Sequence, residues 1–299
     1  MSIAQRLRRN TAVLSRDVRA EIRGHDLTLM AAGTTFYLAV AGIPMVLLAI
    51  RLATLLTSPQ RVLQLGLEVA SGLPSALHTD QAVRAMITAG SQLTLTQGLL
   101  SLIPASLYGE GLRRAFQRLS PRTASGMRTA WVGRAIAVVL LTVSPLLTLA
   151  TLFAAVRIPG AVGHGLGGIL VAGYLAFLTG WILISLTLVL LYRALAPDRP
   201  GVRALLLGAF GTGSFVAGFL IGFAIFLTIP LQIGEAYGGF EAAAAAAVAG
   251  GWLMLLHALV LIGYSVTLCL DTRLFRSEPA VAPPISLRPS PPPTEAPAR

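Results

Sequence analysis

The sequence has no lysine and few charged residues of any kind. All 23 basic residues are arginine, against 12 acidic ones, and only 12% of the 299 residues are charged. A soluble domain has about a quarter charged residues, because its outer shell must face water. With 55% hydrophobic residues, the chain has too little polar surface to cover a water-facing core. The composition therefore argues against a soluble protein and predicts a membrane protein.

The chain also lacks the residue patterns that most enzymes and metal proteins need. Its single cysteine, Cys269, excludes an internal disulfide. It has no Walker A, H-E-x-x-H or G-x-S-x-G motif, and its four histidines fall in different segments. Its arginines are split among short segments rather than gathered on one basic domain, which argues against nucleic acid as a partner. We therefore expect no enzyme activity, no catalytic or metal site and no cofactor.

Six long stretches contain no acidic or basic side chain, the shortest of 22 residues and the longest of 35. A helix rises about 1.5 Å per residue, so about 20 apolar residues cross the hydrocarbon core of a bilayer. The pattern predicts an all-α polytopic integral membrane protein with six transmembrane helices. Their expected ranges are 29–51, 89–110, 135–156, 168–191, 205–229 and 243–268.

The arginines lie almost entirely in alternate gaps between these runs. Nineteen fall in the amino-terminal segment, after the second and fourth runs and in the tail, against four in the other gaps. Loops on the cytoplasmic side of a membrane carry the excess of basic residues. The distribution predicts that both termini are cytoplasmic.

Three regions are expected along the chain. Residues 1–26 have the periodicity of an amphipathic helix that lies either in the headgroup layer or in the cytoplasm. The six-span transmembrane domain is expected over 27–272, with short amphipathic helices in its first outer loop, about residues 52–88. Eight of the last 23 residues are proline, so 273–299 is predicted to be a disordered cytoplasmic tail.

Ionisable side chains are costly inside a membrane, so the few present here are the first candidates for a site. Glu110 lies at the inner end of the second run, and Arg113 and Arg114 follow at spacings that permit ion pairs on one helix face. These ion pairs either anchor the helix end or belong to a substrate site. His257 lies in the middle of the sixth run, where a hydrogen bond to a neighbouring helix is favoured over a proton relay.

Arginines near cytoplasmic helix ends can hold the phosphates of anionic lipids. The partners expected are therefore membrane lipids of negative charge. The candidate contacts with a substrate or lipid are Glu110, Arg113, Arg114, Arg193, Arg203 and His257.

Small residues and prolines indicate where helices should pack closely or bend. Gly218 and Gly222 form a G-x-x-x-G pair, and Gly208 with Thr212 extends the small-residue pattern, which predicts a packing seam on the fifth span. Prolines in or near three spans are expected to kink them. These are Pro44, Pro104 and Pro145.

Three segments resemble the YihY/BrkB family of bacterial inner-membrane proteins. The stretch AAGTTFYLAVAGIP is similar to the first-span signature, LYRALAPDRPGVRALLLGA to the join between spans four and five, and AYGGF with later residues to the final span. The matching positions are Ala32, Phe36, Tyr37, Pro44, Tyr192, Pro197, Gly208, Tyr237, Gly238, Trp252 and Gly263. The order and spacing of these segments cover most of residues 25–272.

The chain departs from the family pattern at Ala41, Gln117 and Ser265, where serine, asparagine and glutamate are usual. The resemblance implies six spans, cytoplasmic termini and a place in the inner membrane. It carries an old ribonuclease label, which no residue pattern here supports, and a connection with anionic lipid export. Two functions remain open: a transporter or flippase-like protein for an anionic lipid or other amphiphile, and a non-transporting membrane scaffold for envelope assembly.

Overall fold

The structure, a computed structural model, describes residues 16, 24, 26–71, 79–120, 165–195, 197, 200–226, 229 and 233–275. Within these ranges the chain is helical and contains no β-strand, in agreement with the expected all-α class. Four of its helices are long and apolar enough to cross a membrane. The third predicted span, 135–156, lies outside the described residues, as do nearly all of the amino-terminal helix predicted over 1–26 and residues 276–299 of the predicted tail.

The helices at the first, fourth, fifth and sixth predicted spans are the four that are long and apolar enough. They are α2 (Leu27–Leu56), α7 (Leu166–Leu195), α8 (Val202–Phe226) and α9 (Glu241–Leu270). The carboxylate of Asp26 caps α2 by accepting a hydrogen bond from the Leu29 amide at 3.0 Å. A π-helical turn, η3 (Asp271–Phe275), continues α9 past residue 272, where the tail was predicted to follow.

The predicted boundaries of the second span were wrong. Residues 89–91 belong to a short helix, α4 (Thr79–Ser91), and a separate helix, α5 (Leu95–Leu119), follows. The break between them is set by a capping box, in which Thr94 and the Gln97 side chain satisfy each other's backbone amides. α5 is not among the four candidate spans, because it is less apolar towards its carboxyl end.

Between α2 and α5 the chain forms two short helices, α3 (Pro59–Ser71) and α4, which pack against each other. α4 also packs against the second half of α2, where Gly90 comes so close to Ile50 that a Cβ at Gly90 would collide with it. Arg51 of α2 donates from Nη1 to the carbonyl of Ser91, the last residue of α4, at 2.7 Å. The pair is thus fastened to α2; its place relative to a membrane stays a prediction.

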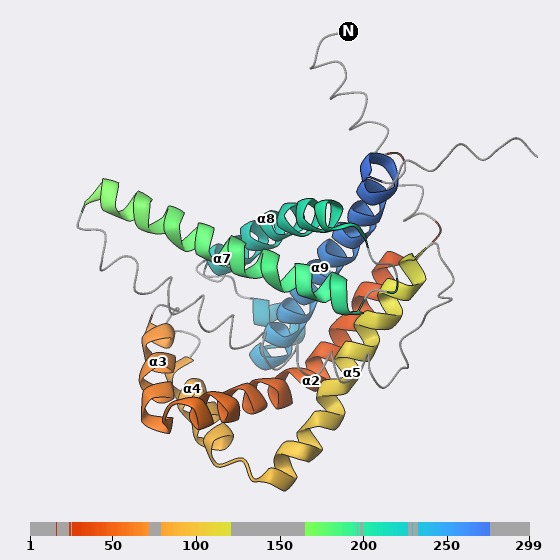
Figure 1. The fold of residues 1–299 in the computed structure, drawn as a ribbon. Helices are drawn as coiled ribbons and strands as arrows, with labels where there is room; N and C mark the ends of the chain where they lie inside the picture. The colour runs from red at the N-terminus through yellow and green to blue at the C-terminus, as the bar shows by residue number, and fades with distance from the viewer. Residues whose placement is uncertain are drawn as a thin grey trace, which may run out of the picture.

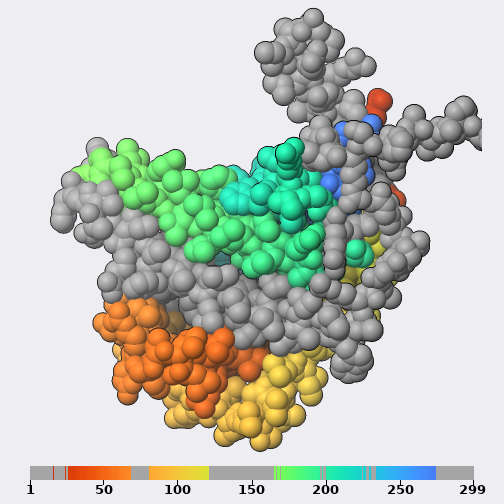
Figure 2. Space-filling model, in the orientation of Figure 1, coloured from red at the N-terminus to blue at the C-terminus, as the bar shows by residue number. Residues whose placement is uncertain are grey.

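The described helices form two pairs joined by α9. α2 packs against α5, and α7 packs against α8. α9 runs between the pairs and contacts α8 on one side and both α2 and α5 on the other (Figure 1). In the space-filling view, α7 and α8 lie at the top of the face, and α3 and α5 lie at the bottom (Figure 2).

Two of the three prolines expected to kink a span lie inside described helices, Pro44 in α2 and Pro104 in α5. α2 changes direction about midway along its length (Figure 1). A proline removes one backbone hydrogen bond and its ring crowds the preceding turn, which accounts for the bend. Pro145 lies outside the described residues.

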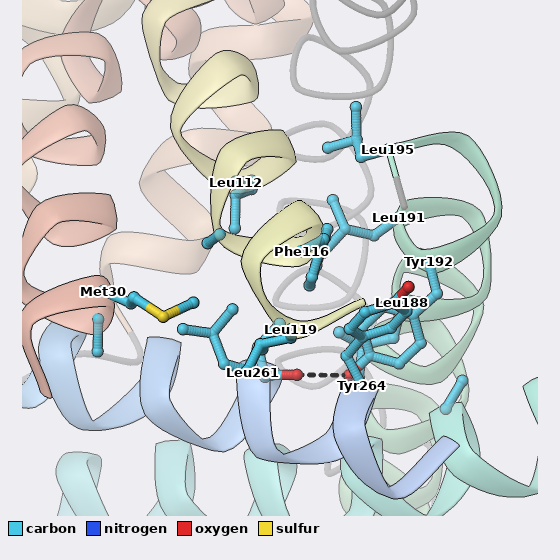
Figure 3. Packing of buried hydrophobic residues seen from close by; sticks show 14 of the residues in the cluster. Met30, Leu112, Phe116, Leu119, Leu188, Leu191, Tyr192, Leu195, Leu261 and Tyr264 are labelled. Carbon is cyan, nitrogen blue, oxygen red and sulfur yellow. Dashed lines mark hydrogen bonds between the residues drawn. The ribbon is translucent and has the colours of Figure 1, made fainter. Parts of the chain in front are cut away.

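The core lies where α5, α7 and α9 meet. The rings of Phe116, Tyr192 and Tyr264, one from each helix, point toward one another (Figure 3). Their centroids lie 4.7 to 5.7 Å apart, within the range of favourable aromatic contact. All three side chains are fully buried. The Tyr192 hydroxyl donates to the Val260 carbonyl at 2.8 Å, so its polar end is satisfied inside the core.

Candidate functional site

Glu110 forms ion pairs with two arginines of its own helix, as the spacing predicted. Arg113 donates from Nε to Oε2 at 2.8 Å and from Nη2 to Oε1 at 2.7 Å. Arg114 donates from Nε to Oε1 at 2.8 Å. The fork of Arg113 is therefore bidentate, the strongest geometry for a guanidinium and a carboxylate. These residues form the Glu110–Arg113–Arg114 cluster.

The cluster lies inside α5 rather than at its end. The helix continues to Leu119, about two and a half turns beyond Glu110, so the expectation that Glu110 ends the helix was wrong. Glu110 is only 7% exposed. Next to it, Gly111 lies against the ring of Tyr37 from α2, and a Cβ at Gly111 would collide with that ring. The missing side chain lets α2 approach α5 directly beside Glu110.

The two arginines of the cluster differ in exposure. The Arg113 side chain is 15% exposed, and that of Arg114 is 62% exposed. Arg113 is held by two bonds and neutralises most of the charge of Glu110. Arg114 uses only Nε, so its two Nη groups make no hydrogen bond to another described residue. This arrangement offers a cationic fork to an external anion.

The other predicted arginine contacts do not join this cluster. Arg193 lies near the carboxyl end of α7 and Arg203 in the first turn of α8, and both are exposed. Within the described part of the chain neither forms an ion pair. The six candidate residues therefore do not form one site: three make the cluster, two are separate surface arginines, and His257 is buried elsewhere.

His257 lies at the junction of three helices and is 1% exposed. Its Nε2 is 2.9 Å from the hydroxyl of Tyr108 on α5, and its Nδ1 is 3.0 Å from Oγ1 of Thr35 on α2. Nδ1 also lies 2.8 Å from the Leu253 carbonyl of its own helix. The predicted hydrogen bond to a neighbouring helix is confirmed, with two helices rather than one. We call these three side chains the His257 junction.

The donors and acceptors of the His257 junction are consistent with one arrangement of protons. A carbonyl only accepts, so Nδ1 carries the ring proton that the Leu253 carbonyl receives. Thr35 donates its own proton to the Ala31 carbonyl at 2.9 Å, and so accepts from Nδ1. Nε2 then has a lone pair, and Tyr108 donates to it. A neutral imidazole satisfies every one of these groups.

α8 and α9 interlock through small residues. A Cβ at Gly208 would collide with Thr267 of α9, and a Cβ at Gly263 of α9 would collide with Thr212 of α8. Each threonine donates to the glycine carbonyl four residues earlier on its own helix at 2.7 Å. Two antiparallel G-x-x-x-T patterns thus fit into each other, which brings the backbones close together. These four residues form the α8–α9 seam.

The seam differs from the one predicted on the fifth span. At the expected G-x-x-x-G pair, Gly218 and Gly222, a Cβ would meet no atom of another described residue within 4 Å. Gly208 and Thr212, taken as its extension, form the close approach instead. Close packing needs a matching small residue on the partner helix, which Gly263 supplies and which a pattern read on one helix cannot show.

Contacts at both ends extend the seam. Toward one end, the indole of Trp252 stacks on Phe219 and Phe223, with centroids 4.4 and 4.9 Å apart. At the other end, Asp271 of η3, 3% exposed, accepts from the Gly201 amide just before α8 at 2.8 Å. A carboxylate there also faces the positive end of the α8 dipole. α8 and α9 are therefore joined along most of their length.

The remaining family positions serve local structure. Ala32 and Tyr37 are partly buried on α2 while Phe36 is exposed, and Pro44 lies at the bend of that helix. Gly238 has a φ of +63° in the turn before α9, which favours glycine. Pro197 lies in a bend after α7, and Tyr237 is exposed at the end of a 3₁₀ turn, η2 (Ile233–Tyr237). Ser265, at the family's glutamate position, is fully buried and lies 3.4 Å from the Leu261 carbonyl.

Sequence reasoning missed several residues that hold these sites together. Thr35 and Tyr108 lie 222 and 149 residues from His257, and nothing local marks them as its partners. Thr267 and Gly263 repeat the G-x-x-x-T spacing of Gly208 and Thr212, a signal that comparing the two runs would have found. Asp271 follows the sixth uncharged run. Its position in the sequence did not indicate that it contacts the amino-terminal end of α8.

Comparison with known families gives one match. The family model described as virulence factor BrkB matches residues 18–283 of the chain. Neither the curated proteins nor the solved structures that were compared contain a match. The matched range includes all the described helices, the Glu110–Arg113–Arg114 cluster, the His257 junction and the α8–α9 seam.

Proposed function

The chain belongs to the virulence factor BrkB family, and we propose that it binds an anionic lipid or similar amphiphile in the bacterial inner membrane and moves it across the bilayer. Family membership and four helices of spanning length make it a membrane protein. The inner membrane, the ligand and the movement are the proposed part. The role requires no enzyme activity and no cofactor.

The proposed topology has six spans and cytoplasmic termini. α2, α7, α8 and α9 supply four spans. α5 is 25 residues long, or about 37 Å, which exceeds the hydrocarbon thickness of about 30 Å. Residues 135–156, third in chain order, complete the proposed set of six spans. The distribution of 19 arginines against four supports this orientation, in which the Glu110–Arg113–Arg114 cluster lies near the cytoplasmic face.

The exposed fork of Arg114 is the observation that carries the proposal. Glu110 holds Nε of Arg114, and the Arg114 side chain is 62% exposed. Parallel N–H groups of this kind match two oxygens of a phosphate. Glu110 is then a positioning residue rather than a contact, and Arg113 serves to keep its carboxylate satisfied. This revises the equal roles that the sequence suggested for the three residues.

Basic side chains near the carboxyl end of a helix also have a structural explanation. Arg113, Arg114 and Arg118 all lie in the last three turns of α5, where the helix dipole favours positive charge. Arg118 lies one turn beyond Arg114 and is also exposed. A dipole effect stabilises the helix by about 0.3–1 kcal/mol and makes no demand on the lipid. Dependence on the headgroup charge is therefore the property that separates the two explanations.

The test is reconstitution of the full chain into liposomes that carry labelled phosphatidylglycerol or labelled phosphatidylcholine. We expect the protein to speed transbilayer movement of the anionic lipid. Loss of a charge-assisted bidentate contact costs about 1.5–3 kcal/mol, so Arg114→Gln should slow that movement by about tenfold or more. Arg114→Lys keeps the charge without the fork and should lie between Arg114→Gln and the unmodified protein.

Arg61→Gln is the matched control, since Arg61 is an exposed helical arginine whose side chain donates to Gln64, three residues away, at 3.0 Å. Arg61 lies in the first outer loop, predicted at about residues 52–88, and its replacement should leave the rate unchanged. Movement no faster than in empty liposomes would overturn the transport role. Movement that is real but equal in Arg114→Gln and Arg61→Gln would overturn the assignment of the site.

A non-transporting scaffold is the second candidate, and the filled core favours it. Phe116, Tyr192 and Tyr264 close the space between α5, α7 and α9, and the α8–α9 seam has no room for a Cβ. A scaffold needs such rigidity and no moving parts. It predicts that no lipid moves in any variant, and that partner proteins are lost when residues 1–24 or 277–299 are deleted.

A further inference from the structure

α9 contacts its neighbours through two chemically different interfaces. Toward α8 the contacts in the seam and around Trp252 are steric, glycine against threonine and stacked rings, and the hydrogen bond from the Gly201 amide to Asp271 lies at one end. Toward α2 and α5 the interface contains the His257 junction, whose hydrogen bonds cross between helices. Steric interlocking does not depend on protonation. A hydrogen bond to an imidazole does, so protonation of His257 alters the second interface and leaves the seam as it is.

The proton positions of the junction make it sensitive to one added proton. In the neutral ring Tyr108 donates to Nε2. A proton from water that binds the Nε2 lone pair makes Nε2 a donor and gives the ring a charge of +1. Tyr108 can then only accept from Nε2, and its own O–H loses its partner. A buried donor without an acceptor is costly, and so is a charged ring among apolar helices.

No described carboxylate is placed to offset that charge. The ring's partners are Tyr108 from α5, Thr35 from α2 and the Leu253 carbonyl from α9, and Tyr108 is the titratable group among them. Glu110 on α5 is committed to its two arginines. Asp26 caps α2 and Asp271 binds the Gly201 amide at the end of α9. The remaining charged residues described on α2, α5 and α9 are Arg51, Arg113, Arg114, Arg118 and Glu241, and none of them bonds the ring.

We propose that Nε2 of His257 is a proton-binding site, and that proton uptake there separates α2 and α5 from the α8–α9 pair. The charged ring and the unpaired Tyr108 hydroxyl are relieved when water enters the junction, and water enters when these helices part. α8 and α9 stay together because their contacts are unaffected. If the helix separation drives lipid transport, that part of the proposal rests on the proposed function. Proton binding at Nε2 and the separation of the helices do not depend on it.

The test follows the ring and the helices separately, on the full chain in lipid nanodiscs. Nitrogen NMR of the protein labelled at its histidine rings reports the protonation of each ring nitrogen. The signals of His257 are identified as those that remain when the other three histidines, His25, His78 and His164, are replaced by glutamine. At neutral pH we expect Nδ1 protonated and Nε2 bare. As the pH falls, Nε2 should become protonated.

Helix separation is measured by electron spin resonance between paired spin labels in a Cys269→Ser background. One pair joins α5 and α9 through exposed positions, Leu107→Cys with Leu255→Cys. The matched pair joins α8 and α9, Leu207→Cys with Leu255→Cys, also at exposed positions. Acid should lengthen the first distance over the same pH range in which Nε2 gains its proton, and should leave the second unchanged. His257→Asn, which cannot take up the proton, should remove the change.

Three results would overturn the proposal: an Nε2 that stays bare at every pH at which the protein remains folded, a protonated Nε2 with an unchanged α5–α9 distance, or equal changes in both label pairs. The first two need only the native His257, so misfolding of His257→Asn does not spoil them. None of these measurements involves lipid movement. The proton-binding proposal can therefore be correct when the transport proposal is wrong, and the reverse is also possible.

Discussion

The two faces of α9 show how one helix can be fixed on one side and releasable on the other. On the α8 side, Gly263 and Thr267 fit against Thr212 and Gly208, and each threonine hydroxyl donates to a carbonyl of its own helix. On the α2–α5 side, His257 shares its hydrogen bonds with two other helices. Shape therefore joins the seam, and the second interface combines polar pairing at His257 with the aromatic contact of Phe116 and Tyr264. Substitutions that change shape should act on the first, and those that change pairing on the second.

The largest effect is expected from filling the seam. Gly263→Leu places a side chain where Thr212 already lies, so neither helix can keep its position. We expect the free energy of unfolding to fall by about 3 kcal/mol, the upper end for overpacking. Unfolding in mixed micelles with increasing sodium dodecyl sulfate measures it. Gly250→Leu on the same helix meets no atom within 4 Å of its Cβ and should change stability by less than about 1 kcal/mol. Equal losses would mean that the seam is not tight.

Removing the pairing at the His257 junction should have the next largest effect. His257→Leu leaves the Tyr108 hydroxyl buried without its acceptor, and Tyr108→Phe leaves Nε2 without its donor. Each should cost about 1–2 kcal/mol. The double variant should lose less than the sum, with a coupling of about 1 kcal/mol, typical of hydrogen bonds between transmembrane helices. The same unfolding assay, applied to both single variants and the double variant, completes the double-mutant cycle. Additive losses would show that the two groups do not interact.

A smaller effect is expected where Asp271 meets the start of α8. Asp271→Asn keeps an acceptor for the Gly201 amide but removes the charge that faces the helix dipole. The expected loss is about 0.5–1 kcal/mol. Glu241→Gln is the control, since Glu241 is an exposed acid in the first turn of α9. Added salt should abolish the effect at Glu241 and leave that at Asp271, because a buried charge is screened less. Equal salt sensitivity would contradict this difference.

The smallest effects are expected from replacing one threonine by valine at each of the two interfaces of α9. Thr35→Val removes the acceptor that Nδ1 of His257 contacts on another helix, and should cost about 0.6 kcal/mol. Thr267→Val removes a bond within its own helix while keeping the shape that fits Gly208, so it should cost less than about 0.5 kcal/mol. The two unfolding curves should separate in that order. The reverse order would mean that the seam depends on its hydroxyls.

The span helices were predictable because each uncharged run is longer than a bilayer requires. Runs one, four, five and six became helices whose ends differ from prediction by a few residues. The predicted bounds of the second helix were wrong because the charge of Glu110 was taken as the end of the helix. The backbone instead follows the capping box at Thr94 and continues past Glu110, whose charge is neutralised by its own arginines. A charged residue thus ends an apolar run without ending a helix.

The candidate site was predictable only where it is local. The ion pairs of Glu110 follow from spacings of three and four residues, so the sequence contains them. The partners of His257 come from two distant helices, and their choice depends on how α2, α5 and α9 pack. The predicted position of the seam was wrong for a related reason. On α8 alone, the G-x-x-x-G pair of Gly218 and Gly222 is a stronger packing pattern than Gly208 with Thr212. Which glycine face meets a partner is decided by the residues of α9.

Arg51 gives the short helices a mechanical role. Its bond to Ser91 and the contact of Gly90 with Ile50 fasten α4 to the part of α2 beyond Pro44, while Thr35 lies on the part before it. In the proposed separation of the helices, α3 and α4 would therefore act as a lever arm on α2, with the bend at Pro44 between them and the His257 junction. An antibody fragment that clamps α3 and α4 would hold that arm still, and so lock the junction without touching it.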